Sequence, residues 1–321
     1  MTEPDPQTDC WQWTPRFVVP AVFAVLLVLA QIGYPLSSGI ARDRVTVVVV
    51  MLSAGTALVH AAATRGIRYA VGFLMIVSGL GLLAEIIGTA TGFPFGCYDY
   101  ADGRIGPTVA GVPLVVALAW TGGLYPVWVV AGLLTRRLLG RVLMTAVGAV
   151  GWDLFLDPQM VADGQWSWCA AGWGLPGLHE IPYTNYLGWF AVAVVMAALL
   201  TGLDRVVGMR VMGARSAGVR VSNAETTGGG TSPAESRTGA RELQTALAST
   251  APGSEEEARG PGCRIPAGVL VPVAVFLWTW LGSTLAHAVF LDLPYSAWYG
   301  CVGLGVLGVP LMVRLVGARR G

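Results

Sequence analysis

The sequence predicts an all-α integral membrane protein, and three observations lead to this fold class. Of its 321 residues 54% are apolar and only 12% are charged, about half the charged share of an ordinary soluble domain. The mean hydropathy is +0.62. The apolar residues also fall in blocks of about 20, the length that a helix needs to cross a hydrocarbon core about 30 Å thick. A soluble fold is therefore the least favoured class.

Eight such blocks can be drawn along the chain, each made mostly of Val, Leu, Ala and Gly. They cover about residues 17–35, 45–64, 68–88, 108–134, 141–158, 185–204, 265–290 and 295–315. We therefore expect about eight transmembrane helices. Two long outer loops, 89–107 and 159–184, are dense in aromatic residues, Gly and Pro, which indicates ordered structure rather than mobile linkers.

The basic residues predict how the chain is oriented. All 20 are Arg, and with eight spans 17 of them fall on the face that also carries both termini. Only Arg42, Arg44 and Arg104 lie opposite. The positive-inside rule then places both termini in the cytoplasm of a multi-pass cell-membrane protein. Because 19 acidic residues leave a formal charge of only +1, nucleic-acid binding through a basic face is excluded.

Composition divides the chain into five segments. Residues 1–16 form a cytoplasmic tail, residues 17–205 hold the first six helices with the site motifs, and residues 206–264 form a linker. Residues 265–315 hold the last two helices, before a cytoplasmic tail at 316–321. The linker is dominated by Ala, Gly, Ser, Thr and Pro and cannot bury enough apolar surface to offset the entropy of ordering, so we expect it to be disordered.

The five cysteines indicate no metal site, because they show neither CxxC spacing nor clustering with His. Cys97 and Cys169 are the only two in the predicted outer loops, where an oxidising compartment would permit a disulfide. The sequence gives no distance between them, so the bond stays an open question. If formed, it would join the two loops into a lid.

A few ionisable residues fall inside the predicted spans, where each costs at least ~2.5–3.5 kcal/mol to insert and so needs a partner or a purpose. Glu85 lies near the outer end of the third span, and Asp153 and Asp157 lie at the outer end of the fifth. The i, i+4 spacing of the two Asp residues puts both carboxyl groups on one helix face. Asn185 opens the sixth span at the same depth. We expect these groups to meet in one layer of the outer leaflet.

Structural roles are weighed against this expectation. Asp292, after the seventh span, is a further acid at that depth, whereas a lone His such as His287 is more often structural. Asp157 could simply end the fifth span before Pro158. Glu85 could do no more than accept a hydrogen bond near the membrane surface.

Carboxyl groups held together in a dry site cannot all ionise, so at least one is expected to stay protonated and to serve as a general acid. A neighbouring ionised carboxylate can accept a proton from water. Aromatic rings around them could stabilise a transient cation, although most aromatic residues near span ends are interfacial anchors. The candidates are Phe93, Phe95, Tyr98, Trp120, Trp152, Trp166, Trp168 and Trp189. This combination suits proton-initiated chemistry on an apolar alkene.

Several motifs lie in order between about residues 85 and 190. They are the run from Glu85 to Tyr98, Gly111-Val112-Pro113-Leu114 with Trp120, Trp152-Asp153 with Asp157-Pro158, Gly164-Gln165-Trp166-Ser167-Trp168, and Pro182-Tyr183-Thr184-Asn185-Tyr186-Leu187-Gly188-Trp189. In these motifs the chain resembles the carotenoid biosynthesis membrane protein family that includes bisanhydrobacterioruberin hydratase.

This resemblance implies a hydro-lyase that adds water to the terminal double bond of an acyclic C40 or C50 carotenoid, without a cofactor or a metal. It implies Glu85, Asp153 and Asp157 as the acid and base residues and Asn185 as the residue that orients water. The implied substrate-binding residues are Phe93, Phe95, Tyr98, Trp120, Trp166 and Trp189. The implied partners are the lipophilic carotenoid, membrane lipid and other carotenoid biosynthesis enzymes.

Two other classes stay open. A proton-coupled transporter would use Glu85 and Asp153 as a relay, but it predicts polar residues at every depth, and the inner halves of the spans offer little beyond Ser53, Thr56 and His60. A non-catalytic scaffold for carotenoid enzymes would use the linker for docking and would leave the clustered acids unexplained.

Overall fold

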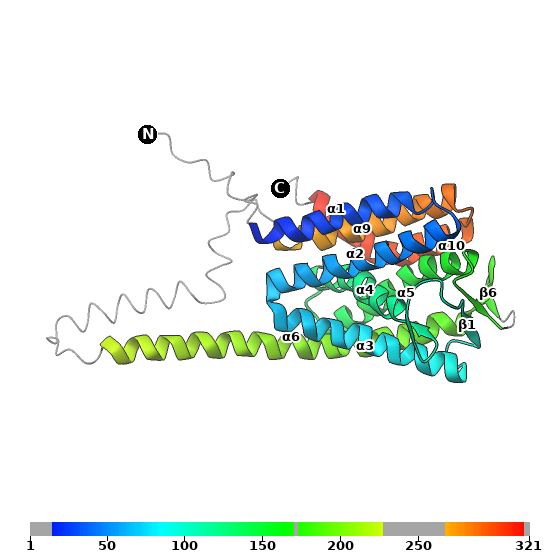
Figure 1. Cartoon of the computed structure of the whole chain (residues 1–321). Helices are drawn as coiled ribbons and strands as arrows, with labels where there is room; N and C mark the ends of the chain where they lie inside the picture. The colour runs from blue at the N-terminus through cyan, green and yellow to red at the C-terminus, as the bar shows by residue number, and fades with distance from the viewer. Residues whose placement is uncertain (1–14, 170–172, 227–266, 318–321) are drawn as a thin grey trace, which may run out of the picture.

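The computed structural model describes residues 15–169, 173–226 and 267–317, which form a bundle of long helices (Figure 1). The helices are α1 (Val18–Gly33), α2 (Gly39–Arg65), α3 (Ile67–Thr91), α4 (Leu114–Leu134), α5 (Leu138–Ala162), α6 (Tyr183–Thr226), α9 (Leu270–Leu285) and α10 (Pro294–Gly317). Short 3-10 turns, η2 (Pro15–Phe17) and η3 (Ala267–Val269), precede α1 and α9, and a π-helical segment, η4 (Ala286–Phe290), continues α9.

The predicted all-α membrane fold is confirmed. Among the described residues seven helices are long and apolar enough to cross a membrane, and α1, with 16 residues, is shorter. At 1.5 Å per residue α1 is only about 24 Å long, less than a hydrocarbon core of about 30 Å. The eight predicted spans therefore correspond to eight helices, of which α1 does not reach the length expected of a span.

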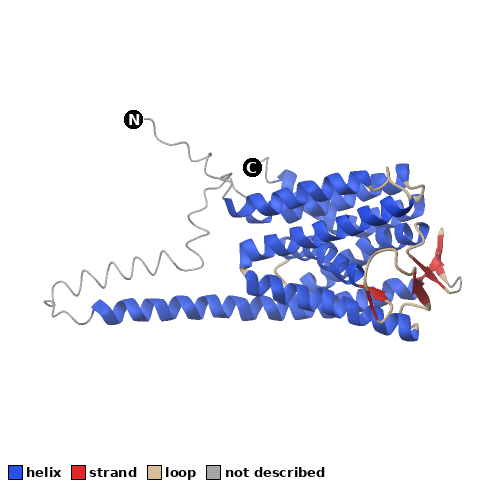
Figure 2. Cartoon of the chain, in the orientation of Figure 1, coloured by secondary structure: helices blue, strands red, loops and turns tan. Residues whose placement is uncertain are grey.

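Short strands gather at one end of the bundle, as Figure 2 shows. They are β1 (Tyr98–Tyr100), β2 (Thr108–Val109), β3 (Val112–Pro113), β4 (Trp166–Trp168), β5 (Gly174–Leu175) and β6 (Leu178–Pro182). They form three antiparallel pairs, β1 with β4, β2 with β3 and β5 with β6. The described residues of the loops 89–107 and 159–184 are structured, as predicted, and the pair of β1 and β4 joins the two loops.

Helix α4 forms the centre of the bundle. Over an apolar stretch of 18 residues, 78% of α4 is buried inside the protein, compared with 28–44% for the other six long helices. This burial explains why α4 is apolar on all sides, since a helix surrounded by other helices has no face in contact with a polar solvent. Around it, α5 and α10 approach closely at Gly151, where an added Cβ would lie 2.6 Å from the backbone of α10. Small residues of this kind are typical of tightly packed membrane helices.

Charged residues join the helices at both ends of the bundle. At the end without strands, Asp204 of α6 binds Arg65 of α2 and, at 2.7 Å, Arg141 of α5. At the strand end, Arg104 contacts Asp43 of α2 at 2.7 Å. Arg42 contacts Asp163, after α5, at 2.6 Å. Two of the three Arg residues predicted to lie opposite the Arg-rich face are thus held in ion pairs.

The predicted end of the fifth span at residue 158 is wrong, because α5 continues through Pro158 to Ala162. Proline has no N–H, so it leaves the carbonyl of Leu154 without its usual helical donor. The hydroxyl of Ser296 on α10 donates to this carbonyl at 2.7 Å. A neighbouring helix therefore supplies the missing hydrogen bond and lets the helix continue.

Other boundaries also differ from the prediction. The fourth span, predicted from residue 108, begins at Leu114 because β2 and β3 form a hairpin before it. Helix α6 continues to Thr226, beyond the predicted boundary at 205 and into the predicted disordered linker. Residues 206–226 contain Val, Met, Ala and Arg without Pro, and extending an existing helix costs far less than nucleating one. The rest of the linker and most of both predicted tails lie outside the described residues.

Replacing Ser296 should destabilise the bundle. The substitution Ser296→Ala leaves the Leu154 carbonyl and the partner nitrogen of His287 without this hydroxyl. We expect a loss of about 1 kcal/mol in the free energy of unfolding, measured as a lower melting temperature in detergent. The exposed Ser167→Ala is the matched control, and equal melting temperatures for the two variants would contradict the role of Ser296.

Candidate active site

A small cavity beneath the strands brings the predicted polar residues together. Glu85 of α3, Asp153 and Asp157 of α5 and Asn185 of α6 all line it, and their exposed fractions are 4%, 1%, 5% and 2%. The cavity measures about 20 Å³, and because one water needs about 10–15 Å³ by this measure, it has room for about one. The expected meeting of carboxyl groups from separate helices is therefore present.

The remaining wall of the cavity is mostly aromatic. It consists of Tyr98, Tyr100, Val116, Trp120, Leu156, Trp166, Trp168 and Trp189. No lining residue in the described part of the chain is basic. The carboxyl groups therefore have hydroxyl, amide and carboxyl neighbours but no cationic partner in the wall. To limit their mutual repulsion, they must share protons.

One amide contacts both carboxyl groups of α5. Asp153 and Asp157 lie one helical turn apart and share a face, as their spacing predicts. The side-chain amide of Asn185 donates to Oδ2 of Asp157, and its nitrogen lies 3.5 Å from Oδ2 of Asp153. Asn185 can reach them because α6 begins at Tyr183, directly after β6.

Two tyrosine hydroxyls serve the third carboxyl group. The hydroxyl of Tyr98 donates to Oε2 of Glu85 at 2.5 Å, and Tyr100 is a second hydroxyl neighbour of the same carboxyl. Burial, followed by the neighbouring Glu85 carboxyl, raises the pKa of Tyr98 far above its ordinary value. Burial likewise raises the pKa of Tyr100. Both residues therefore act as neutral hydrogen-bond donors.

The strand register explains why four aromatic side chains cover the site. Side chains two residues apart on a strand share one face. In the antiparallel pair of β1 and β4, Tyr98 lies opposite Trp168 and Tyr100 lies opposite Trp166. All four side chains line the cavity, so this strand pair is a lid over the carboxyl groups.

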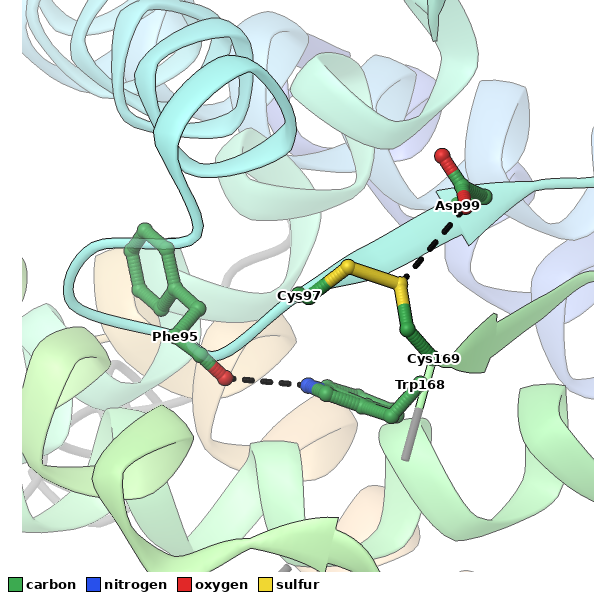
Figure 3. Close-up of a disulfide and its surroundings, with 5 residues drawn as sticks. All are labelled: Phe95, Cys97, Asp99, Trp168 and Cys169. Atoms are coloured by element: carbon green, nitrogen blue, oxygen red, sulfur yellow. Dashed lines mark hydrogen bonds between the residues drawn. A yellow bond between two sulfur atoms is a disulfide. The ribbon is translucent and has the colours of Figure 1, made fainter. Parts of the chain in front are cut away.

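A disulfide fixes the lid, and it answers the question that the sequence left open. The backbone N–H of Cys169 donates to the carbonyl of Cys97 at 2.8 Å, one step beyond the paired strands. The two residues form a disulfide (Figure 3). The indole N–H of Trp168 also donates to the carbonyl of Phe95 at 2.9 Å. The lid is thus connected to the turn after α3 by three separate contacts.

Stacked rings continue from the lid into the bundle. The ring centroid of Trp189 lies 4.1 Å from that of Trp120 and 4.6 Å from that of Phe95. Trp152 meets Trp120 edge to face at 5.2 Å. Trp120 and Trp189 line the carboxyl cavity, and Phe95 and Trp152 pack against them.

Several residues that were weighed for the site do not line the cavity. Phe93 directly follows the helix-ending Gly92, is 75% exposed and does not line the cavity, so its role in substrate binding stays a prediction. Phe95 does not line the cavity either, but it packs on Trp189, which does. Asp292 lies in an exposed turn after η4 and does not join the acids. His287 is buried but contacts Ser296 and Gln159 instead, which is a structural environment.

Tyr100 is the lining residue that the sequence analysis missed. A signal for it existed, because it follows Tyr98 by two residues and would share its face on a strand. Val116 and Leu156 were also missed, since an apolar residue inside a predicted span carries no sign of its position. Among the described residues no cluster of His, Cys, Asp and Glu could hold a metal ion.

Comparison with protein families places this site in a known group. A family model described as carotenoid biosynthesis protein matches residues 45–223, more than half of the chain. The chain belongs to the carotenoid biosynthesis protein family. The match includes every residue that lines the carboxyl cavity, whereas α9 and α10 lie outside it. No curated protein and no solved structure matches the chain.

This carotenoid biosynthesis protein should tolerate an added methyl group poorly at Gly88. A Cβ at Gly88 would lie 2.6 Å from the ring of Phe95 and 2.8 Å from the Tyr98 hydroxyl. Gly88→Ala should therefore displace the Tyr98 hydroxyl from Glu85 and lower the free energy of unfolding by about 1–3 kcal/mol, measured by thermal unfolding. Gly79→Ala is the control on the same helix, because a Cβ there meets open space. Equal stability of the two variants would contradict the close packing.

Proposed function

We propose that this protein adds water across the terminal C=C bond of an acyclic carotenoid. The observation that carries the proposal is the cavity in which three carboxyl groups and one amide meet under an aromatic lid, with room for about one water. Membership of the carotenoid biosynthesis family supports a polyene substrate. A long polyene dissolves in the bilayer and can approach a site inside a helix bundle from the side.

The proposed reaction needs one proton donor, one water and one proton acceptor. A protonated carboxyl group transfers its proton to the less substituted carbon of the terminal alkene, whose π electrons form the new C–H bond. A tertiary cation remains at C-1. Water donates an electron pair to this cation, and the resulting oxonium ion loses a proton to a carboxylate. The net change is the addition of one water, and the carboxyl groups together recover the proton that they supplied.

The hydrogen-bond donors suggest which carboxyl carries the proton. Donors favour the charged form of a carboxyl group. Glu85 accepts from Tyr98, and Asp157 accepts from Asn185, whereas the amide nitrogen of Asn185 lies 3.5 Å from Asp153. We therefore assign Asp153 as the proton donor, Asp157 as the acceptor of the proton from water, and Asn185 as the residue that orients that water.

The aromatic wall would protect the cation and hold the substrate. Ring faces stabilise positive charge when water is excluded. Tyr98, Trp120, Trp166 and Trp189 line the cavity of the carboxyl groups, and Phe95 packs behind Trp189, so a cation formed near Asp153 would lie among rings. Because the cavity holds about one water and no alkene, we infer that part of the wall moves when the substrate enters.

We also propose that the lid faces the outside of the cell membrane. The Arg-rich end, with Arg65 and Arg141, lies opposite the strands and would face the cytoplasm by the positive-inside rule. The Cys97–Cys169 disulfide supports the same orientation independently, since disulfides persist in oxidising compartments.

Removing the proton donor should abolish the product. In cells that make an acyclic carotenoid, Asp153→Asn should lower water addition by about 10²-fold or more. Glu85→Gln should have an effect of similar size, because it removes a carboxyl group with which the neighbouring carboxyl groups of the cavity share protons. The measurement is the mass-spectrometric gain of one water per modified end. Glu180→Gln, in an exposed carboxyl on β6, is the matched control and should keep wild-type activity. Failure of the wild-type protein to hydrate any acyclic carotenoid would refute the proposed function.

The disulfide offers a test of orientation in intact cells. Cys97 and Cys169 should react with a thiol-specific reagent only after reduction. A membrane-impermeant reductant added to whole cells or spheroplasts should be sufficient if the lid faces outward, and labelling is read as a gel shift. The Cys97→Ser, Cys169→Ser double variant should show no such change. A requirement for cell lysis before labelling would reverse the proposed orientation.

A further inference from the structure

A second, larger cavity lies deeper in the bundle, between α1, α2, α4, α5, α9 and α10. It measures about 120 Å³, room for several water molecules. Leu156 lines both this cavity and the carboxyl cavity. Trp152, which contacts Trp120 of the carboxyl site, is also part of its wall. The two cavities are therefore neighbours separated by side chains.

The wall of the second cavity contains polar groups that have no partner. The hydroxyls of Ser53, Thr279 and Ser283 line it and make no hydrogen bond with any described residue. Gln31 accepts from Trp278 through its oxygen at 2.8 Å, and its amide nitrogen has no acceptor among the described residues. The wall is mostly apolar, but these polar groups among the apolar side chains can each bind a water, whereas a cavity lined only by apolar groups stays empty. A hydrocarbon occupant would leave all these groups unsatisfied.

The backbone of α4 adds a further acceptor. Pro126 interrupts α4 and has no N–H for the carbonyl of Gly122, and both residues line the second cavity. At the comparable Pro158 of α5, a side chain, Ser296, supplies the missing donor. No side chain of the described residues does so for Gly122, which leaves this carbonyl to a water.

A third, smaller cavity extends the series toward the Arg-rich end. Ser53, Gly122 and Pro126 line it together with His60, and it measures about 10 Å³, close to the space of one water. His60 is 2% exposed. Its Nδ1 pairs with the Tyr125 hydroxyl at 2.8 Å, and its Nε2 makes no hydrogen bond of normal geometry with the described residues, although the Gly268 backbone is a polar neighbour of the ring. An unpartnered buried nitrogen in the wall of a water-sized cavity indicates a bound water.

We propose that the second and third cavities hold an internal store of water that refills the carboxyl site, with Leu156 separating the store from the site. This inference rests on the proposed hydration, which consumes one water in each turnover. The carboxyl cavity holds about one water and is closed by the disulfide-bonded lid. A supply from within the bundle lets the lid stay closed while the site is recharged.

The first experiment measures bound water without any substrate. Hydroxyl radicals produced from bound water by a short X-ray pulse oxidise adjacent side chains, and mass spectrometry locates them in the purified protein. Trp152 and Phe276, in the cavity wall, should be oxidised, whereas the fully buried Trp128, which lines none of the three cavities, should not. Equal labelling of Trp152 and Trp128 would overturn the inference, and it would favour a hydrocarbon or lipid occupant.

The second experiment connects the water to turnover. Thr279→Leu fills the cavity with an apolar side chain and should abolish oxidation of Trp152 and lower the hydration rate on the order of tenfold. Thr284→Leu, on the same helix but outside the cavities, is the matched control, because Thr284 bonds only to the Trp280 carbonyl. Lost labelling with an unchanged rate would refute a role in supply. If the wild type shows labelling but no hydratase activity, the proposed function fails while the hydrated cavity stands.

Discussion

A polar group inside an apolar helix bundle needs a partner, and this constraint determines where the polar residues of this protein lie. At the Arg-rich end, Asp204 binds two Arg residues from different helices. Near the strands, Ser296 supplies the hydrogen bond that Pro158 removes from its own helix. Each contact joins helices that are distant in sequence, so satisfying the polar groups also sets the relative positions of α2, α5, α6 and α10.

The carboxyl site and the deeper cavities are the exceptions to this rule. Three carboxyl groups meet with hydroxyl and amide donors but with no basic side chain in the described wall. A cluster of this kind has no evident structural benefit, because replacing buried charged groups by packed apolar residues is often neutral or stabilising. Repulsion retained among buried carboxyl groups is typical of a functional site. The family membership of the chain gives that site a chemical context.

Hydration of a carotenoid would bring together two reactants that do not mix, a polyene from the bilayer and a water molecule. The bundle provides a separate environment for each. Stacked rings surround the carboxyl groups, and the deeper cavities carry hydroxyl, amide and carbonyl groups without partners. Leu156, in contact with both, lies where a thin apolar partition would keep water from the cation until it is needed.

The sequence by itself determined the membrane class, the approximate spans, the family and the polar residues of the site, because each of these leaves a local signal. Apolar length predicts a span, and an acid inside a span stands out. The sequence could not predict the continuation of α5 through Pro158, the exposure of Phe93, or the place of Tyr100 in the cavity wall. The Cys97–Cys169 bond and the unpartnered Ser53 and Thr279 hydroxyls were likewise decided by the tertiary structure. Each of these features depends on which residue of another helix or strand, distant in sequence, lies next to the side chain in space. Those neighbours are determined only when the whole bundle packs.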